Sequence, residues 1–453
     1  QQFHWEFSPP RGRPTRGSAT KTMASPFGSM AADRTLVVAD DLTGAMDTGH
    51  SFAMRGYGTF VRLDPEFDTP EAAVIVADTD SRYVSPDEAA ARVRSVVAST
   101  DASIVYKKVD STLRGNVGVE IAAAHDAMDA EATAVAPAYP SNGRLTACGN
   151  HLVDGELLTD TEVGMDPDSN INTSHVPRLL REQIGGPVVH AGVECVASRS
   201  TVDAFQRPDG FEADDRLVVV FDIVHDSHLD AVAAGAHEHD GDVLLVGSAG
   251  LAEYVRSPGE AGKGSPSVAT NSSGIAFGVA GSVNPRTLTQ LDTVPKSQVV
   301  HLDARTAVTA PDDAAKNAAE ECLERFQTEP AVVLTAASDS DTVAATLEAA
   351  KDVNISGREA RERITASLGV ATRVVWTKRS PDGLFLTGGS IAKSILDRLD
   401  ADGLALHGEE IDIGVPVGEI RGGSGDGAPV VTKAGAFGGN STIVDALDHL
   451  RRV

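Results

Sequence analysis

The sequence predicts an α/β protein of two domains, each with a mainly parallel sheet flanked by helices. From Arg34 onward, short apolar runs alternate with stretches that carry apolar residues at helical spacing, a pattern typical of βαβ units. Residues 256–274 are rich in Gly, Ser and Pro, have no periodicity and indicate a linker. Aromatic residues make up only 4% of the 453 residues, which favours close-packed α/β layers over an aromatic-rich β-sandwich.

In the first half, short apolar runs predict strands. These are Thr35–Ala39, Thr59–Leu63, Ala73–Ala77, Ile104–Lys107, Ala132–Ala136, Leu217–Phe221 and Val243–Val246. Between two of them, apolar residues such as Val117 and Ile121 predict a helix over Asn116–Met128 with one buried stripe. Another helix is expected to begin near Leu42 and to end at Gly56.

The second half repeats the alternation. Its predicted strands lie near Ile275–Ala280, Gln298–Leu302, Ala331–Thr335, Gly383–Thr387 and Pro429–Lys433. We therefore expect an N-terminal domain over residues 30–255 and a C-terminal domain over residues 275–453. Residues 1–29 lack the apolar core of a secretory signal and are expected to be a disordered tail or an over-extended translation start.

The charge of the chain excludes several classes of partner. There are 39 Lys and Arg against 65 Asp and Glu, a formal charge of −26 that repels phosphate backbones and anionic lipid. We therefore expect neither a nucleic acid nor a membrane as a partner. Only 10 of the cations are lysine, and an acidic surface poor in lysine is expected of a protein adapted to concentrated salt. The three cysteines are widely spaced and form no disulfide pattern, so we expect a cytoplasmic protein. The oligomeric state stays open, with a homo-oligomer as one possibility.

Polar segments that follow strands are candidate sites, because ligands of open α/β sheets bind beyond the carboxyl ends of the strands. The strand Thr35–Ala39 leads directly into Asp40 and Asp41, and Thr43 and Gly44 follow at the start of a helix. Two carboxylates at a strand end can orient a polyol hydroxyl and accept its proton. The alternative is that Asp41 or Thr43 simply caps the helix.

Two more segments of the first half carry cations. Arg82 follows a predicted strand and either holds a carboxylate through a bidentate pair or is an ordinary surface arginine. A further strand runs into a polar segment at a helix start, with Lys107, Lys108, Asp110, Ser111, Thr112, Arg114 and Gly115. Cations and hydroxyls at a helix N-terminus predict an anion site; a solvated turn with an Asp–Arg pair is the alternative. For His151, in a later turn-rich segment, we favour a hydrogen-bonded core histidine over a base.

Three glycine-rich segments of the second half each follow a strand. They contain Ser282 in GVAGSVNPRT, Gly388, Gly389, Ser390 and Ile391 in LTGGSIA, and Gly435 in VVTKAGAFG. Glycine lets backbone N–H groups approach a phosphate closely, and a helix behind the loop adds the positive end of its dipole. Neither GxGxxG nor GxxxxGK[ST] occurs in this half, so we predict a nucleotide-phosphate site of another kind. Tight turns are the alternative for any single segment.

Five segments together resemble the four-carbon acid sugar kinase family in sequence and order. They are ADDLTGAMDTG at 39–49, KKVDSTLRGN at 107–116, APAYPSNGR at 136–144, LTGGSIA at 386–392 and VTKAGAFG at 431–438. The resemblance implies ATP-dependent phosphorylation of the 4-hydroxyl of a tetronate such as threonate, erythronate or an oxo form. It also implies an N-terminal domain for the acid, a C-terminal domain for ATP and an active site in the cleft between them.

Carried over residue by residue, the resemblance assigns both sites. The acid is placed near Asp40, Asp41, Thr43, Arg82, Asp110, Ser111 and Arg114, and ATP near Ser282, Gly388, Gly389, Ser390, Ile391 and Gly435. We add Gly44 and Lys108 to the acid site and take Asp40 or Asp41 as the catalytic base. Mg²⁺ is expected because it bridges phosphate oxygens, but its ligands are unknown. Many relatives have Gly-Gly-acid-Thr where this chain has residues 388–391, which puts an acidic group near the metal in doubt.

Two other functions stay open. A non-catalytic sugar-acid sensor of the same fold is motivated by the altered segment at residues 388–391. A sugar-acid dehydrogenase is also a two-domain α/β enzyme, although the missing GxGxxG counts against it. The choice among tetronates and their stereoisomers also stays open, because a few side-chain positions read chirality.

Overall fold

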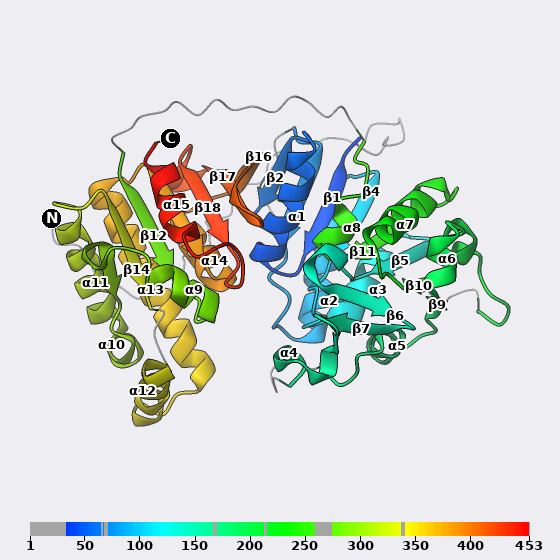
Figure 1. Cartoon of the computed structure of the whole chain (residues 1–453), viewed down its shortest axis with the longest axis horizontal. Coiled ribbons are helices and arrows are strands. Elements are labelled where there is room, and N and C mark those ends of the chain that lie inside the picture. Colours follow the sequence, from blue (N-terminus) through cyan, green and yellow to red (C-terminus); the bar gives the residue numbers. More distant parts are fainter. Residues whose placement is uncertain are drawn as a thin grey trace, which may run out of the picture. The chain divides into compact units, whose positions relative to one another are not determined.

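The computed structural model describes residues 33–64, 67, 71–165, 169, 171–212, 215–258, 274–336 and 340–452. These residues form two compact units, built mainly from residues 33–258 and 274–452 (Figure 1). The predicted tail, and all but the two ends of the predicted linker, lie outside the described residues. The predicted α/β class with two mainly parallel sheets is confirmed. The domain boundaries stay a prediction.

The N-terminal unit contains a parallel sheet with the strand order β2-β3-β1-β4-β11-β5-β10-β9. The strands are β1 (Thr35–Ala39), β2 (Thr59–Arg62), β3 (Val74–Asp78), β4 (Ile104–Lys108), β5 (Ala132–Ala136), β9 (Val189–Ala191), β10 (Val218–Phe221) and β11 (Val243–Gly247). Strands β1, β3 and β5 are buried along their whole length, as expected for a parallel sheet covered on both faces. Their carboxyl ends therefore share one edge.

Two groups of helices cover this sheet. The helices are α1 (Leu42–Met54), α2 (Pro86–Ser99), α3 (Val117–Met128), α4 (Glu162–Met165), α5 (Val176–Ile184), α6 (Val193–Ala197), α7 (Asp226–Glu238) and α8 (Ala249–Ala252). α3 packs on α2 and α5, whereas α8 packs on α1 and α7. Apolar side chains of α2, α3 and α5, including Val93, Ile121 and Leu180, share one core with the sheet.

A small antiparallel sheet was not predicted in the N-terminal unit. It consists of β6 (Arg144–Ala147), β7 (Asn150–Val153) and β8 (Glu156–Leu157). These strands have two to four residues, too few for a hydrophobic period to show, so the segment looked only rich in turns. The sheet carries His151 into the interior.

The C-terminal unit has the strand order β13-β14-β12-β15-β18-β17-β16. The strands are β12 (Ala276–Ala280), β13 (Val299–His301), β14 (Ala331–Thr335), β15 (Gly383–Thr387), β16 (Gly403–Asp412), β17 (Val415–Arg421) and β18 (Pro429–Lys433). The pairs from β13 to β18 are parallel, but β17 runs antiparallel to β18. The sequence prediction missed β16 and β17, which are joined through Ile413 and Gly414, the latter at φ +72°.

Helices cover this second sheet as well. They are α9 (Pro285–Leu291), α10 (Ala304–Thr309), α11 (Pro311–Arg325), α12 (Ser340–Asp352), α13 (Gly357–Arg379), α14 (Gly389–Arg398) and α15 (Thr442–Leu450). α9 packs on α15, and α13 packs on α11 and α14. Phe385, Val431 and Ile443 belong to the core between the sheet and α15.

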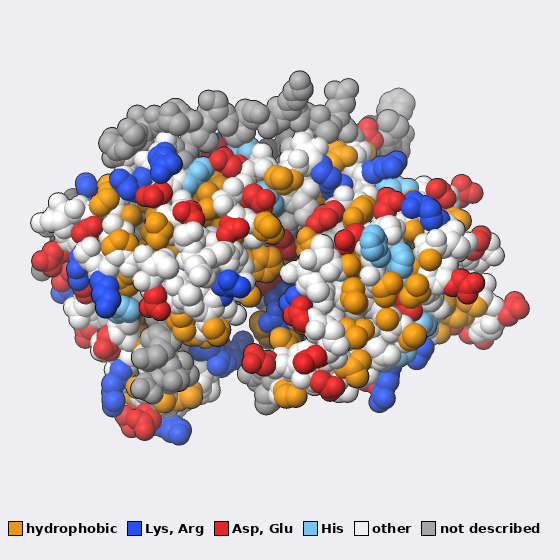
Figure 2. Space-filling view, in the orientation of Figure 1, with side chains coloured by type: hydrophobic (Ala, Val, Ile, Leu, Met, Phe, Trp, Pro, Cys, Tyr) orange, Lys and Arg blue, Asp and Glu red, His pale blue; other side chains and the backbone are white. Residues whose placement is uncertain are grey.

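Charged side chains of both signs lie on the surface of the described residues (Figure 2). On the face shown in Figure 2, Lys and Arg side chains of the described residues are interspersed with Asp and Glu side chains. Within the described ranges, no helix has both the length and the apolar character needed to cross a bilayer.

Candidate active site

The carboxyl ends of three adjacent strands bring the predicted acid-binding residues together. β1 lies between β3 and β4, and Ala39 at its end is level with Asp78 of β3 and Lys108 of β4. The segments at or after these ends carry Asp40, Asp41, Thr43, Gly44, Arg82, Lys108, Asp110, Ser111 and Arg114. Strand order, which the sequence does not reveal, thus joins three separate segments into one cluster.

Arg82 lies at the centre of this cluster. Its Nε and one terminal nitrogen donate to the two carboxylate oxygens of Asp40 over 2.7 and 3.0 Å, and its other terminal nitrogen donates to Asp41 over 2.7 Å. Burial by itself would raise the pKa of Asp40, but the Arg82 guanidinium, together with the charges of Lys107 and Lys108, holds that pKa below its usual value. Arg82 is therefore no ordinary surface arginine, and it pairs with carboxylates of the protein itself.

Asp41 makes two contacts at once. Its Oδ1 accepts the backbone N–H of Gly44 over 2.8 Å and caps α1, while its Oδ2 accepts from Arg82. The helix cap, which the sequence left as the alternative, is thus observed. The Asp41 side chain is 25% exposed, against 4% for Asp40. Asp41 is therefore the aspartate of the pair that a ligand reaches more easily.

The loop after β4 is held by a second ion pair. Arg114 donates to the two carboxylate oxygens of Asp110 over 2.6 and 2.9 Å, and Thr112 donates its hydroxyl hydrogen to the same carboxylate. Burial would raise the pKa of Asp110, but Arg82 and Arg114 hold it far below its usual range. The Asp–Arg pair that the sequence offered as an alternative is present. The Arg114 side chain is still 34% exposed and can meet a ligand at its edge.

Lys107 does not face a ligand site. Its ammonium is fully buried, 2.8 Å from Glu120 of α3, and donates to the backbone carbonyls of Val38 and Lys108. This pair joins the ends of β1 and β4 to a helix behind the cluster. Sequence reasoning missed Glu120, although a single carboxylate inside the apolar run VGVEIAAA is the signal that could have revealed it.

Lys108 is the cation of the cluster without a carboxylate partner in the described part of the chain. Its buried ammonium donates to the carbonyl of Val109 over 3.0 Å. A Cβ at Gly44 would lie 2.9 Å from this ammonium and 2.8 Å from Asp41 Oδ1, so glycine is needed for the close approach. Thr43, in the first turn of α1, is partly buried. A buried ammonium with free donors is suited to hold an anion.

His151 forms a hydrogen bond with the loop that follows β4. Its Nε2 donates to the backbone carbonyl of Ser111 over 2.8 Å, and its Nδ1 lies 3.2 Å from the Thr146 hydroxyl. Burial lowers the pKa of His151 to about 4, so the ring is neutral near pH 7. The prediction of a hydrogen-bonded core histidine is confirmed.

The predicted nucleotide residues also meet at neighbouring strand ends. β15 lies between β12 and β18, and these strands lead to Ser282, Gly388 and Gly435. A Cβ at Gly435 would collide with the Ser282 hydroxyl, so the two loops touch through a glycine. Gly388 has φ +100° and precedes α14, whose first-turn N–H groups have no helical acceptor. The backbone N–H groups at this edge of the sheet are thus arranged to donate hydrogen bonds to anionic oxygens.

The two departures from the family pattern differ in their surroundings. The Ser390 side chain is exposed, whereas Ile391 is only 8% exposed and packs beneath Gly281. Only the backbone N–H of Ile391 is therefore available to a phosphate. Within the described ranges, no three His, Cys, Asp or Glu side chains are grouped to hold a metal ion.

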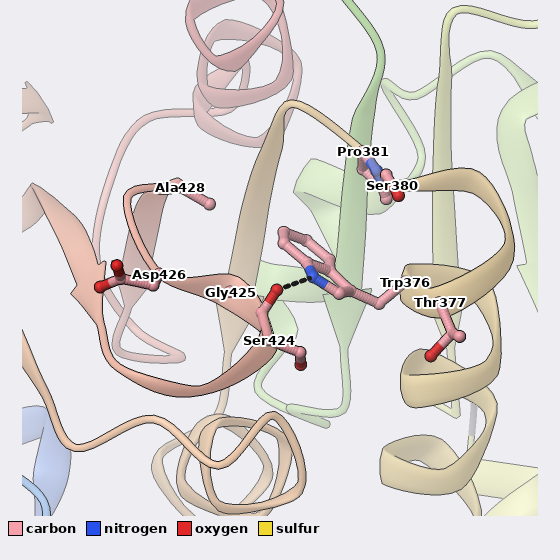
Figure 3. A pocket seen from close by; sticks show the side chains of 8 residues that line it. All are labelled: Trp376, Thr377, Ser380, Pro381, Ser424, Gly425, Asp426 and Ala428. Atoms are coloured by element: carbon pink, nitrogen blue, oxygen red, sulfur yellow. Dashed lines mark hydrogen bonds between the residues drawn. The ribbon is translucent and has the colours of Figure 1, made fainter.

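A separate cavity of about 330 Å³ lies in the C-terminal unit (Figure 3). Trp376 lines it and donates its indole N–H to the carbonyl of Ser424 over 3.0 Å. Pro381 and Ala428 line it just before β15 and β18 begin. The cavity therefore lies at the amino ends of these strands, away from the edge that carries Gly388.

Comparison with known proteins shows which family the chain belongs to. Residues 35–255 match a family described as a sugar-binding N-terminal domain, and residues 277–443 match one described as a nucleotide-binding C-terminal domain. The chain is 32% identical over 430 residues to a D-threonate kinase from Salmonella typhimurium, covering 92% of this chain and 98% of that one. The chain belongs to the four-carbon acid sugar kinase family. The resemblance drawn from the five segments is thereby confirmed.

The chain is also similar in sequence to other kinases of four-carbon acids and in fold to two solved structures. The chain is 29% identical to a D-erythronate kinase from Heliobacterium modesticaldum, covering 92% of this chain and 96% of that one. A 3-oxo-tetronate kinase from Pseudomonas fluorescens is 24% identical, with coverage of 91% and 96%. The fold matches a Salmonella typhimurium protein described as a tRNA synthase, with TM-score 0.75, 22% identity and coverage of 91% and 98%. A Haemophilus influenzae protein matches with TM-score 0.67, 21% identity and the same coverage. At these identities, the structures show the fold alone.

Proposed function

We propose that this protein is an ATP-dependent kinase that phosphorylates the 4-hydroxyl of a four-carbon sugar acid. The observation that carries the proposal is the buried Lys108 ammonium, which has no carboxylate partner among the described residues and lies beside Asp41. An anion-binding cation next to a carboxylate suits a substrate that has both an acid group and a hydroxyl. The names of the relatives, kinases of threonate, erythronate and 3-oxo-tetronate, support the same substrate class.

In the proposed reaction, Lys108 and the exposed edge of Arg114 hold the carboxylate of the acid. Asp41, the more exposed of the two aspartates, accepts the proton of the 4-hydroxyl. The hydroxyl oxygen bonds to the γ-phosphorus of ATP, the bond from that phosphorus to the β–γ bridging oxygen breaks, and ADP leaves with that oxygen. Arg82 donates to both carboxylates and so holds Asp41 in place beside the hydroxyl, while its charge lowers the pKa of Asp40.

The C-terminal unit is proposed to hold ATP through backbone groups. The N–H groups at the start of α14 and the loop around Gly435 face the phosphates, with Ser282 beside them. Phosphoryl transfer has a loose transition state, so that placement and charge neutralisation supply most of the acceleration. Because the described carboxylates of the acid site pair with arginines, we expect Mg²⁺ to enter bound to the phosphates of ATP. Transfer also requires the two units to meet over the substrates, which stays a prediction.

The proposal is tested by a coupled assay of ADP release with the isomers of threonate, erythronate and 3-oxo-tetronate, at low and molar salt. With ATP and one of these acids, we expect the enzyme to release one ADP for each molecule of acid that is phosphorylated. Calorimetry on the same samples shows whether the acid binds. Binding without ADP release would favour the non-catalytic sensor, and a change in NADH fluorescence on mixing would revive the dehydrogenase.

A further inference from the structure

Lys433, the last residue of β18, is a buried lysine that neither the proposed reaction nor any predicted contact uses. Lys433 is 3% exposed, and its ammonium has no ion pair among the described residues. Instead it donates to the carbonyls of Ala434 and Gly435 over 2.9 and 3.1 Å and to the Thr287 hydroxyl over 3.1 Å, with the Phe437 carbonyl at 3.4 Å. An ammonium has three hydrogens, so these acceptors occupy all of them.

These contacts fix the direction of the loop peptides. In a trans peptide the C=O and the N–H point in opposite directions, so a carbonyl turned toward Lys433 turns its N–H away. The N–H groups of the three peptides concerned belong to Gly435, Ala436 and Gly438. Within the described part of the chain, none of these three N–H groups donates to a protein acceptor. Successive N–H groups turned to one side of a loop form a concave anion site.

Side chains of helix α9 donate to carbonyls of the same loop, two of which also accept from Lys433. The Thr287 hydroxyl donates to the Gly435 carbonyl over 2.9 Å. The Gln290 amide donates to the carbonyls of Phe437 and Gly439 over 3.0 and 2.7 Å. Thr287 and Gln290 are both fully buried. The loop therefore has a closed inner side, made of carbonyls and their donors, and an outer side that carries the N–H groups.

We propose that Lys433 is a positioning residue for ATP: its ammonium holds the carbonyls of Ala434, Gly435 and Phe437 inward, so that the N–H groups of Gly435, Ala436 and Gly438 face the polyphosphate. This inference rests on the proposed function, because it takes ATP as the ligand of this loop. Lys433 itself does not touch the nucleotide, since its donors are occupied. Its positive charge behind the loop also favours an anion in front of it.

The charge of Lys433 is sensitive to pH. Burial, and to a smaller extent the nearby Arg286 of α9, lower the pKa of Lys433 to about 8. A second charged group beside the loop is Asp412, the last residue of β16, whose carboxylate accepts hydrogen bonds from the Gly439 N–H and the Thr442 hydroxyl. Above about pH 8 the amine loses the proton that its third hydrogen bond requires, so the loop loses one restraint and its positive charge.

The test measures ATP binding directly, by calorimetry on the full chain, for the wild type, Lys433→Met and Lys316→Met. Lys316 is an exposed lysine of α11 and serves as the matched control. We expect Lys433→Met to weaken ATP binding by about tenfold or more, the effect of misdirecting one or two hydrogen bonds to an anion, with acid binding unchanged. The wild-type affinity for ATP should also fall as the pH rises through about 8, and this step should be absent in Lys433→Met.

A second variant covers the case in which Lys433→Met does not fold. Thr287→Val keeps the shape of the side chain and removes only the hydroxyl that links Lys433 to Gly435, and it should weaken ATP binding severalfold. Unchanged ATP affinity in a folded Lys433→Met or Thr287→Val protein overturns the inference, as does a wild-type protein that binds no ATP. A wild type that binds ATP with this dependence on Lys433 but transfers no phosphate overturns the proposed kinase and leaves this inference standing.

Discussion

The guanidinium of Arg82 forms a two-point ion pair with the carboxylate of Asp40, with N–O distances of 2.7 and 3.0 Å. The two residues lie 42 positions apart, in the segments that follow β1 and β3. Asp40 and Arg82 are only 3% and 9% exposed, so neither charge has water as an alternative partner. This pair therefore organises the acid site before any ligand arrives.

Removal of Arg82 should destabilise the fold. Arg82→Met leaves Asp40 buried without its cation, and breaking a buried pair in this way costs about 3–5 kcal/mol. Urea unfolding measures the loss, with Arg92→Met as the control, because Arg92 pairs with Glu88 at the surface. A free energy of unfolding for Arg82→Met close to that of Arg92→Met would show that the pair does not organise the site.

The two aspartates should respond differently to neutralisation. Asparagine also caps helices, so Asp41→Asn should keep the cap on α1 and lose only the contact with Arg82, a smaller loss of stability than that of Asp40→Asn, while turnover falls by about 10²–10⁴. Asp40→Asn removes the partner of the buried Arg82 and should lower both stability and turnover. Thermal unfolding and ADP release are measured on both variants. Turnover of Asp41→Asn within a few-fold of the wild type would remove Asp41 from the role of base.

Lys108 should determine the affinity for the acid and not for ATP. Lys108→Met removes the ammonium that has no carboxylate partner in the described chain, so KM for the acid should rise about tenfold or more, the loss of one charge-assisted hydrogen bond. Gly44→Ala should have a similar effect, because its Cβ would lie 2.9 Å from the ammonium. Steady-state kinetics with each substrate varied in turn separate the two KM values. An equal rise in both would contradict this assignment.

His151 should make the fold less stable in mild acid. Its pKa is lowered to about 4 in the native state, while an unfolded histidine keeps a pKa of 6.5, so the unfolded chain binds more protons between these values. Stability from this source is present above pH 6.5 and is lost progressively as the pH falls toward 4. His151→Gln lacks this loss, and the wild type should lose about 2–3 kcal/mol more than the variant. Parallel pH profiles of the two proteins would refute the prediction.

The sequence predicted the strands of the two parallel sheets well, because a strand buried on both faces is a plain apolar run. The predicted bounds of Thr35–Ala39, Ala132–Ala136 and Gly383–Thr387 match β1, β5 and β15. The short strands of the antiparallel sheet, the three-residue β9, and β16 and β17 were missed. The first two groups have only two to four residues in each strand, and the sequences of β16 and β17 are interrupted by glycine, proline or charged residues.

The partners of the charged residues were harder to predict. The sequence placed Lys107, Lys108 and Arg114 in one anion site, but the structure pairs Lys107 with Glu120 and Arg114 with Asp110. The pair of Asp110 and Arg114 spans only four residues and was the alternative that the sequence offered. The pair of Lys107 and Glu120 depends on strand order and helix rotation, which do not follow from spacing along the chain. The carbonyl contacts of Lys433 were invisible for the same reason, since they depend on the path of a loop.

The most direct test of the central claim is the identity of the product. Phosphorus and proton NMR on a reaction of ATP with the preferred tetronate should show a phosphate ester at the terminal C4 oxygen, formed in equal amount to ADP. The Asp41→Asn protein should form this ester far more slowly. An acid that binds but never gains a phosphate, or gains it at another hydroxyl, would contradict the account.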